Sequence, residues 1–360
     1  MKSKSKKVVF IVPTPLEISP SQRFRFEQYL PALKQNNISY VIKPYFTLKG
    51  RKALYSNNLT KKVSVVLYGY IKRIFLLFTM PMYDYVFIHR EAAPVGPPIF
   101  PWIIAKLMRK KIIYDFDDAI WLPLMSDYNR KFSFVKSFSK VGKLCRWSYN
   151  VVVGNKYLQS YALQYNKRVT VIPTVVNTQT LHNVIQNQDI DTPAIGWTGS
   201  FSTLVYLDIV LPVLQRLQEK HDFVFYVIAD KDPQLPLKRY KFIQWNKDTE
   251  VTDLLKFHIG LMPLYDDEFS KGKCGFKAIQ YMSLGLPAVV SPVGVNTEIV
   301  DDGINGFICK TETEWELHLE SLLINNNKRK IMGQSARKKI ESKYSVASST
   351  SDFLGLFSNS

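Results

Sequence analysis

Short apolar runs that alternate with helix-length amphipathic segments constrain the fold of this chain more than any other feature. Val8–Val12 is a β-branched run that Pro13 closes, and Phe24–Lys34 follows it with apolar residues at helical spacing. The same alternation continues as far as Val169–Ile172. Strands that are each followed by a helix predict a parallel sheet with helices on both faces.

The alternation stops once and then restarts. Residues 177–193 are rich in Asn, Gln, Asp and Thr and have little to bury, which indicates a linker. After it, Ala194–Thr198 is a predicted strand, Tyr206–Lys220 a helix, and Phe223–Ala229 a nearly continuous apolar strand. We therefore expect an α/β chain of two Rossmann-like domains whose parallel sheets face each other across a cleft. The predicted divisions are a first domain at 1–177, a linker at 178–193, a second domain at 194–345, and a segment at 346–360 that is a candidate for packing back on the first domain.

The charge balance points to an anionic partner. The chain has 48 Lys and Arg residues against 30 Asp and Glu, a formal net charge of +18. Such a balance favours nucleic acid, a phospholipid surface or a phosphorylated substrate. The three cysteines show no CxxC spacing, which suggests free thiols in a reducing compartment. The five scattered histidines argue against a structural zinc site.

A glycine-bearing loop at Gly272–Gly275 leads into a predicted helix at Phe276–Leu284. The N-terminus of a helix offers N–H groups and a partial positive charge, so it is a good site for a pyrophosphate. Lys273 and Lys277 bracket the same end and add full charges. The alternative is a surface helix that merely begins with lysines, but cations there oppose the helix dipole, which favours the anion site.

Four ordered stretches resemble glycosyltransferase family 4. They are "PSQRFRFEQYLPAL" at 20–33, "DFDDAIW" at 115–121, "IGWTGS" at 195–200 and "KCGFKAIQYMSLGLPAVVSPVGVNTEIV" at 273–300. The resemblance thus spans both halves of the chain. It implies the GT-B fold and a retaining, hexosyltransferase-type enzyme that needs no cofactor and no bound metal.

The same resemblance implies the substrates. The donor is a nucleotide-diphosphate sugar, and the acceptor is a glycan or polyprenyl-linked glycan of bacterial surface polysaccharide synthesis. Matching positions assign the donor site to Gly199, Ser200, Lys273, Gly275, Phe276, Lys277, Gln280 and Glu298, with Arg23 and Arg25 as further candidates for the phosphate charge.

The sequence departs from the family pattern at two places. The first acidic position of the family falls on Gly272, and the second falls on Gln280, whose amide can still bond a ribose hydroxyl. Residues 201–207 also lack the basic residues that usually follow the "TGS" turn. Asp266, Asp267 and Glu268 lie just upstream of Gly272 and are candidates to supply the missing carboxylate.

The first domain contributes three candidate catalytic residues. Asp117 and Asp118 follow a predicted strand, and we expect them to line the cleft near the acceptor as a base or an orienting group. A DxD spacing with Asp115 also suits a metal site in the other main glycosyltransferase fold, and helix capping is the simpler alternative. His89 ends another strand and is a candidate for proton transfer, although a histidine there is commonly just a hydrogen-bonded polar residue. Lys277 is the fourth catalytic candidate, as stabiliser of the leaving pyrophosphate.

Basic and aromatic residues interleave in two stretches of the first domain. The cations are Lys61, Lys62, Lys72, Arg73, Lys106, Arg109, Lys110 and Lys111. The aromatic residues among them include Tyr68, Phe75, Phe78, Phe100 and Trp102.

This composition suits an anionic membrane surface and predicts a cytoplasmic protein that is peripheral at the inner face of the membrane. The charges Lys72 and Arg73 at the middle of Val63–Met82 favour an interfacial or core helix over a spanning one. Nucleic acid is disfavoured because no nucleic-acid-binding signature appears, and buried aromatics with solvated lysines remain the simpler alternative.

Two other functions stay open at this point. One is a GT-B nucleotide-sugar epimerase, which consumes donor without any acceptor-linked product. The other is a non-catalytic module that binds a membrane or a glycan, which the glycine at the first acidic position makes conceivable.

Overall fold

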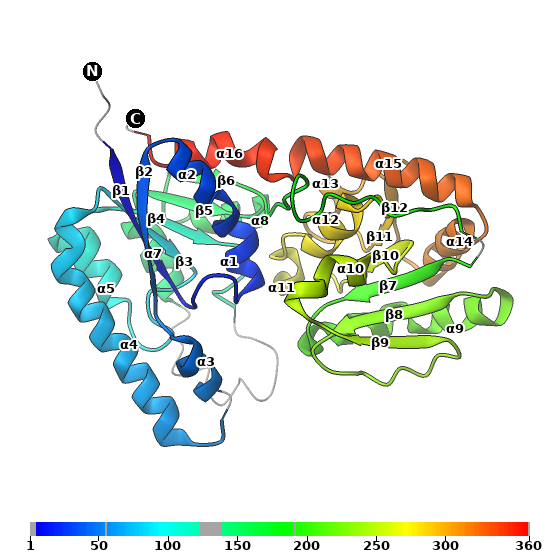
Figure 1. Cartoon of the computed structure of the whole chain (residues 1–360), viewed down its shortest axis with the longest axis horizontal. Coiled ribbons are helices and arrows are strands. Elements are labelled where there is room, and N and C mark those ends of the chain that lie inside the picture. Colours follow the sequence, from blue (N-terminus) through cyan, green and yellow to red (C-terminus); the bar gives the residue numbers. More distant parts are fainter. Residues whose placement is uncertain (1–4, 55, 123–138, 191, 359–360) are drawn as a thin grey trace. The chain divides into compact units, whose positions relative to one another are not determined.

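The computed structural model describes residues 5–54, 56–122, 139–190 and 192–358. The chain divides into two compact units. Unit 1 comprises Met1–Pro173 and Thr350–Ser360, and unit 2 comprises Thr174–Ser349. Each unit contains a six-stranded sheet in which every pair of neighbouring strands is parallel, with helices around it (Figure 1). The α/β architecture predicted from the alternating pattern is therefore confirmed.

The sheet of unit 1 has the order β2-β1-β3-β4-β5-β6. Its strands are β1 (Lys6–Val12), β2 (Ile38–Pro44), β3 (Tyr85–His89), β4 (Lys111–Phe116), β5 (Asn150–Val153) and β6 (Val169–Val171). In the register of β3 with β4, His89 lies opposite Asp115 at the carboxyl ends of both strands. The apolar runs form these strands because β-branched and aromatic side chains pack well on a sheet that helices cover on both faces.

The helices of unit 1 surround this sheet. They are α1 (Pro20–Arg25), η1 (Glu27–Tyr29), α2 (Leu30–Gln35), α3 (Leu48–Leu54), α4 (Leu59–Thr79), η2 (Met80–Met82), α5 (Ile99–Trp102), η3 (Ile103–Leu107), α7 (Lys140–Trp147) and α8 (Lys156–Leu163).

The end of the chain contributes to the core of unit 1. Helix α16 (Val346–Gly355) begins in unit 2 and ends in unit 1. Phe353 stacks on Tyr29 with ring centroids 4.3 Å apart, and Phe357 packs edge-on against Tyr85 at 5.7 Å. The carbonyl of Phe357 also accepts a hydrogen bond from the side chain of Lys6 at 2.5 Å. The last residues described are thus held by aromatic packing rather than left as a tail.

Two residues that the sequence pattern grouped with the basic and aromatic surface are buried instead. Arg73 is 2% exposed and Phe100 is 7% exposed. The guanidinium of Arg73 donates hydrogen bonds to the backbone carbonyls of Ala92 and Lys43 in unit 1. Phe100 packs near Tyr70, with ring centroids 5.7 Å apart. A helical residue next to a partly exposed lysine can still face inward, because residues one apart point in different directions.

The sheet of unit 2 has the order β12-β11-β10-β7-β8-β9. Its strands are β7 (Ala194–Thr198), β8 (Val224–Ala229), β9 (Tyr240–Gln244), β10 (Ile259–Met262), β11 (Ala288–Val290) and β12 (Gly306–Ile308). Its helices are η4 (Phe201–Ile209), α9 (Leu211–Lys220), η5 (Lys247–Thr249), α10 (Glu250–Leu254), α11 (Glu268–Lys271), α12 (Phe276–Ser283), α13 (Asn296–Ile299), α14 (Glu312–Leu323) and α15 (Asn326–Lys343). Trp197 and Trp315 are the largest fully buried side chains of its core.

The polar stretch predicted as a linker packs against unit 2. The side chain of Gln188 donates to the carbonyls of His258 and Gly285, each at 3.2 Å. Arg337 donates to the carbonyls of His182, at 2.6 Å, and Thr178, at 3.0 Å. The compact units instead divide between Pro173 and Thr174. A polar run can pack in this way because its backbone and amide groups are hydrogen-bonded, which a count of apolar residues does not register.

Candidate functional site

The carboxyl ends of adjacent strands in unit 2 gather the loops that carry the predicted donor residues. Strands β7, β10 and β11 are neighbours in the sheet. The loop after β7 contains Gly199 and Ser200, the segment after β10 leads through α11 to α12, and the turn after β11 leads to α13. Ligands of such sheets bind outside the carboxyl ends of the strands, so this edge is the candidate site.

Gly275 sets the position of the α12 N-terminus. It precedes Phe276, the first residue of α12, with φ at +66°, in the left-handed region. A Cβ at this position would lie 2.1 Å from Cδ1 of Ile299 and 3.1 Å from Cγ1 of Val295. Both the conformation and the close approach to α13 therefore require glycine. The turn aims the positive end of α12 at the carboxyl edge of the sheet.

Tyr281 holds α12 against the central strands. Its hydroxyl accepts a hydrogen bond from the backbone N–H of Thr198 at 2.9 Å. A Cβ at Gly260, on β10, would lie 2.2 Å from the Tyr281 ring, so the glycine lets the helix lie close to the sheet. The position of the α12 N-terminus relative to β7 is thus fixed by a buried contact and not by the loop alone.

Both predicted lysines lie over aromatic rings at this edge. Nζ of Lys273 is 4.5 Å from the ring centroid of Phe269 and 5.6 Å from that of Tyr206. Nζ of Lys277 is 5.5 Å from a ring centroid of Trp197, at the end of β7. Cation–π contacts stabilise these positions without neutralising the charge. The two ammonium groups therefore lie at the same edge of the sheet as the N-terminus of α12.

Gly199 and Ser200 lie beside the same tryptophan. A Cβ at Gly199 would lie 2.4 Å from the Trp197 ring, so a larger residue would displace it. Ser200 precedes η4, and its hydroxyl lies 2.9 Å from that of Ser202. Trp197 was not predicted as a site residue, although its place at the end of the first strand of "IGWTGS" was the available signal.

The three carboxylates upstream of Gly272 contact groups of their own loop and of α11. Oδ1 of Asp267 accepts from the backbone N–H of Ser270 at 2.6 Å and caps α11. Asp266 and Glu268 form ion pairs with Lys271, with N···O distances of 3.5 and 3.3 Å. These contacts stabilise the loop and keep its acidic groups around Lys271.

Asn296, in the first turn of α13, is a buried polar residue that the sequence analysis missed. It is 1% exposed, and its Nδ2 donates to the carbonyl of Ser291 at 3.1 Å. Its Oδ1 has no hydrogen-bond partner among the described residues and lies 3.6 Å from where a Cβ of Gly275 would be. A buried acceptor of this kind costs free energy unless a ligand or water satisfies it. The asparagine in "VGVN" is the only sequence signal for it.

Gln280 and Glu298 differ in exposure. Gln280 lies on α12 and is 6% exposed. Glu298 is exposed on α13, in its first turn, where a carboxylate also complements the helix dipole. The eight predicted donor residues of unit 2 thus lie on α12 and the loop that precedes it, on α13, and in the loop after β7.

At the carboxyl edge of the unit 1 sheet, His89 and Asp115 belong to a chain of polar contacts. Ser21 Oγ lies 2.9 Å from His89 Nε2, and His89 Nδ1 lies 2.7 Å from Oδ2 of Asp115. The other carboxylate oxygen, Oδ1, pairs with the guanidinium of Arg25 at 2.5 Å. Burial opposes ionisation of Asp115, but the charge of Arg25 and the contact with His89 outweigh it and lower the pKa of the carboxyl.

Arg23 and Arg25 were predicted to carry phosphate charge. Arg25 is 2% exposed, and it also donates to the carbonyl of Ile172. Its guanidinium instead pairs with the buried carboxylate of Asp115, because a buried cation needs an anionic partner. The guanidinium of Arg23 lies 5.0 Å from the ring centroid of Phe24.

Asp117 and Asp118 both lie close to Arg90. Oδ1 of Asp117 accepts from Arg90 Nε at 2.8 Å, and Asp118 is 3.9 Å from the same guanidinium. Burial opposes ionisation of Asp117, but the charge of Arg90 outweighs it and holds the pKa of this carboxyl far below its usual range. Among the described residues, no group of three or more His, Cys, Asp or Glu side chains could hold a metal ion.

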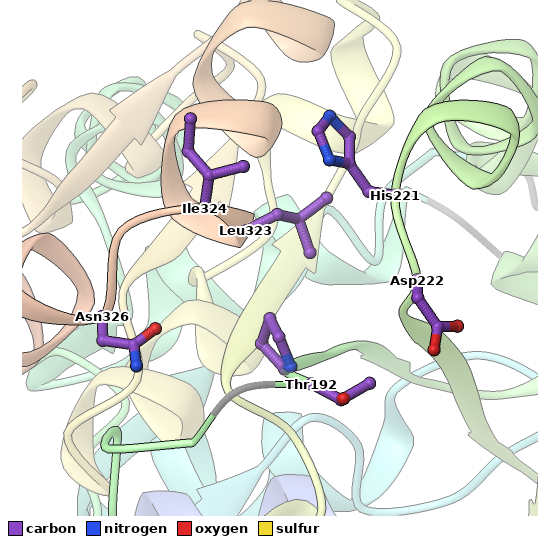
Figure 2. Close-up of a pocket in the computed structure, with 7 residues that line it drawn as sticks. Thr192, His221, Asp222, Leu323, Ile324 and Asn326 are labelled. Atoms are coloured by element: carbon purple, nitrogen blue, oxygen red, sulfur yellow. The ribbon is translucent and has the colours of Figure 1, made fainter.

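A separate pocket of about 440 Å³ lies at the opposite, amino end of β7 (Figure 2). It is lined by Thr192, Pro193, His221, Asp222, Leu323, Ile324 and Asn326. His221 pairs with Glu320 at 2.7 Å. Because it lies away from the carboxyl ends of the strands, we do not assign it to the candidate site.

Comparisons with known proteins agree with the fold described above. Residues 184–339 match the family model described as glycosyl transferases group 1. Among solved structures, the chain is similar to sucrose-phosphate synthase from Thermosynechococcus elongatus, with a TM-score of 0.70, 12% identity and 98% of each chain covered. It is also similar to a glycosyltransferase from Rickettsia africae, with a TM-score of 0.69, 14% identity, and 99% of this chain and 100% of that chain covered.

A third structure carries a nucleotide. The Anabaena protein HepE, in complex with UDP and glucose, is similar to this chain with a TM-score of 0.65, 15% identity, and 97% of this chain and 98% of that chain covered. No curated protein matches the sequence. These likenesses show that the chain has the GT-B fold, and the family match supports a glycosyltransferase whose group 1 region lies within unit 2.

Proposed function

We propose that this protein transfers a sugar from a nucleotide-diphosphate sugar to a glycan or lipid-linked acceptor. The observation that carries the proposal is the glycine turn at Gly275, which presents the α12 N-terminus with Lys273 and Lys277 at the carboxyl edge of the sheet. This turn lies inside the region that matches group 1 glycosyltransferases. Structurally similar proteins have been solved with UDP-glucose, in HepE, and with UDP and α-GlcNAc-glycerol, in TarM.

The chemistry proposed for unit 2 is stabilisation of the leaving group. When the bond from the sugar to the diphosphate breaks, negative charge develops on the departing oxygen. Positive groups fixed in advance stabilise that charge most effectively, and Lys273, Lys277 and the α12 N-terminus are such groups. The proposal includes transfer without a bound metal, because these charges meet the electrostatic requirement. It also includes transfer with retention, which the sequence resemblance supports. Oδ1 of Asn296 can accept a hydrogen bond from a hydroxyl group of the nucleotide sugar.

The chemistry proposed for unit 1 concerns the acceptor. His89 was the candidate for proton transfer, but it is 1% exposed, and its Nδ1 and Nε2 are engaged by Asp115 and Ser21. We therefore assign it to the network that positions groups at this edge. Asp117 is a weak base because its pKa is strongly lowered, so we assign it and Asp118 an orienting role through Arg90. The acceptor class, and with it a place in bacterial surface polysaccharide synthesis at the cytoplasmic face of the membrane, is part of the proposal that the sequence resemblance supports.

A thermal-shift screen against UDP-, GDP-, ADP- and CMP-sugars, without added metal, tests the donor site. We expect stabilisation by one nucleotide class in the wild type and loss of that shift in Lys277→Ala. Lys338→Ala, at an exposed position on α15, is the matched control and should keep the shift. If no nucleotide sugar shifts the folded wild type, the proposal fails and a non-catalytic binding module becomes the better account.

The labelled donor from that screen then separates transfer from epimerisation. Sugar transfer yields a labelled product attached to an acceptor. An epimerase converts the donor without any acceptor-linked product, and that result would overturn the transfer proposal.

A further inference from the structure

The outer face of α4 is a continuous apolar surface. The exposed side chains recur every three or four residues, which is the spacing of one helix face. They are Val63, Leu67, Tyr68, Ile71, Ile74, Phe75, Phe78 and, just beyond the helix, Met82. Phe75 is 67% exposed and Phe78 is 77% exposed, so even the largest groups face outward. Single exposed apolar residues are ordinary, but a contiguous stripe of them marks an interaction surface. We call this set the α4 stripe.

The opposite face of α4 is fastened to unit 1 by buried hydrogen bonds. Arg73 donates to the carbonyls of Ala92 at 2.7 Å, Lys43 at 2.9 Å and Val12 at 3.1 Å. Burial lowers the pKa of Arg73 to about 10, which leaves it charged near neutral pH. Tyr45 donates to the carbonyl of Val66 at 2.7 Å. These contacts decide which face of the helix points outward.

By length and composition alone, Leu59–Met82 is the one segment among the described residues that qualifies to cross a membrane. Crossing would require Arg73 to give up three buried carbonyl contacts and enter hydrocarbon with its charge. The structure therefore favours a helix that stays on unit 1 and presents only the α4 stripe. Figure 1 shows α4 as a long helix at the periphery of unit 1 with α5 beside it.

The sequence around the stripe carries positive charge only. No Asp or Glu occurs between Glu27 and Asp84. The same interval contains Lys34, Lys43, Lys49, Arg51, Lys52, Lys61, Lys62, Lys72 and Arg73. Lys61 is exposed at the start of α4, and Lys72 lies 5.4 Å from the ring centroid of Tyr68, within the stripe. The apolar surface is thus flanked by ammonium groups.

The neighbouring α5 and η3 extend this surface at the other end of α4. Trp102 and Leu107 are exposed there, together with Lys106 and Arg109. Lys110, which follows η3, donates to the carbonyls of Pro81, at 3.1 Å, and Tyr83, at 2.7 Å, in the segment that follows α4. The interval from Ala92 to Tyr114 also lacks Asp and Glu.

A pocket of about 380 Å³ lies between α3 and α4 at the beginning of the stripe. Its walls include Tyr45, Phe46 and Tyr68, and Lys49 and Lys61 also line it. Aromatic walls beside two amines suit a ligand that is partly hydrocarbon and partly anionic. This combination again describes a phospholipid better than a polar ligand.

We propose that α4 lies in the headgroup layer of an anionic bilayer, with the α4 stripe dipping toward the acyl chains. Aliphatic and aromatic groups flanked by lysines suit that environment, because apolar burial and attraction to anionic lipid add together. A second copy of this chain would bring the same cations face to face, which like-charge repulsion disfavours. Nucleic acid offers no partner for the aliphatic members of the stripe, such as Leu67 and Ile71. This surface involves no residue of the donor site, so the inference goes beyond the proposed transfer reaction.

Vesicle co-sedimentation of the full chain tests the proposal. We expect binding to phosphatidylcholine vesicles that contain phosphatidylglycerol, much weaker binding to pure phosphatidylcholine, and weakening by salt. Phe75→Glu/Phe78→Glu should lower the affinity at least roughly tenfold, because two large apolar groups are removed from the layer. Lys61→Glu/Lys62→Glu should reduce the preference for anionic lipid. Leu317→Glu/Ile331→Glu changes two apolar residues of unit 2 that are 59% and 54% exposed, and this control should bind like the wild type.

Three outcomes would overturn the proposal. One is wild-type protein that stays in solution with the anionic vesicles, and another is an equal loss of binding in the unit 2 control. The third is self-association that depends on Phe75 and Phe78 and persists without lipid, which would assign the stripe to a second copy. Cooperative thermal unfolding without ligand shows that each variant is folded. The nucleotide-sugar thermal shift, measured on the same preparations, separates failure of this proposal from failure of the donor site.

Discussion

The carboxyl edges of the two sheets use charge in opposite ways. In unit 1, Arg25, Asp115 and His89 are buried and satisfy one another. In unit 2, Lys273 and Lys277 lie over aromatic rings beside a glycine turn. The same parallel architecture thus supports a buried ion-pair network at one edge and two lysines on aromatic rings beside a helix N-terminus at the other. We infer that the unit 1 network positions groups, whereas the unit 2 edge binds an anion.

The largest expected effect comes from breaking the unit 1 network. Asp115→Ala leaves the guanidinium of Arg25 buried without its carboxylate, and both side chains are almost fully buried. We expect the free energy of unfolding to fall by about 3–5 kcal/mol. Urea denaturation measures this, and a loss below about 1 kcal/mol would show that the network is not structural.

A glycine substitution probes the unit 2 edge. Gly275→Ala introduces a Cβ 2.1 Å from Ile299 at a left-handed backbone position, so we expect a loss of about 2–4 kcal/mol and loss of nucleotide binding. Gly303→Ala is the matched control, since Gly303 has φ +73° but no atom within 4 Å of its Cβ position. It should cost only the backbone strain, about 1 kcal/mol. If both substitutions lowered the free energy of unfolding equally, the close contact of Gly275 with Ile299 would not be the cause of the loss.

The two units are expected to lose stability in different pH ranges. Burial, assisted by the charge of Arg329, lowers the pKa of His258 in unit 2 to about 4 from its usual 6.5. Below pH 6.5 the imidazole of His258 binds a proton in the unfolded chain, whereas in the folded chain it does so only near pH 4. The free energy of unfolding therefore decreases as the pH falls from 6.5 to 4. The expected loss is up to about 3 kcal/mol.

Asp115 in unit 1 behaves differently because its pKa is lowered below 3.8, so its contribution is lost only at lower pH. His258→Gln should flatten the pH dependence of the free energy of unfolding between pH 6.5 and 4. An unchanged slope in the variant would contradict the assignment to His258.

The smallest expected effect concerns the acidic loop before Gly272. Asp266→Ala/Glu268→Ala removes two exposed partners of Lys271, and exposed ion pairs contribute little. We expect no resolvable change in the free energy of unfolding and no more than about a twofold change in nucleotide-sugar affinity. Isothermal titration would detect a tenfold loss of affinity, which would mean that this loop supplies the carboxylate absent at Gly272.

The sequence predicted the elements better than the contacts between them. Runs such as Val8–Val12 and Phe223–Ala229 specify strands locally, and the turn at Gly275 followed by a helix is readable because only glycine fits there. The network of Arg25 with Asp115 joins residues 90 positions apart in the chain. Local patterns carry no information about such a pairing, which is why Arg25 was predicted to bind phosphate.

Two further errors have the same physical origin. Arg73 sits beside the partly exposed Lys72 in the sequence, and only the packing of α4 on unit 1 shows that its charge is buried against carbonyls. Asn296 lies in a short turn whose asparagine has several ordinary uses in proteins. Its burial beside Gly275 emerges only when α12 and α13 come together.

The most direct test of the central claim compares a nucleoside diphosphate with its nucleoside, once the thermal-shift screen has identified the base. Calorimetry on the wild type should show much tighter binding of the diphosphate, because the α12 N-terminus, Lys273 and Lys277 bind the pyrophosphate. In Lys273→Ala/Lys277→Ala this preference should fall by at least about tenfold, with the unfolding temperature unchanged. The same preference in the double variant as in the wild type would contradict the assignment of the pyrophosphate to this edge of unit 2.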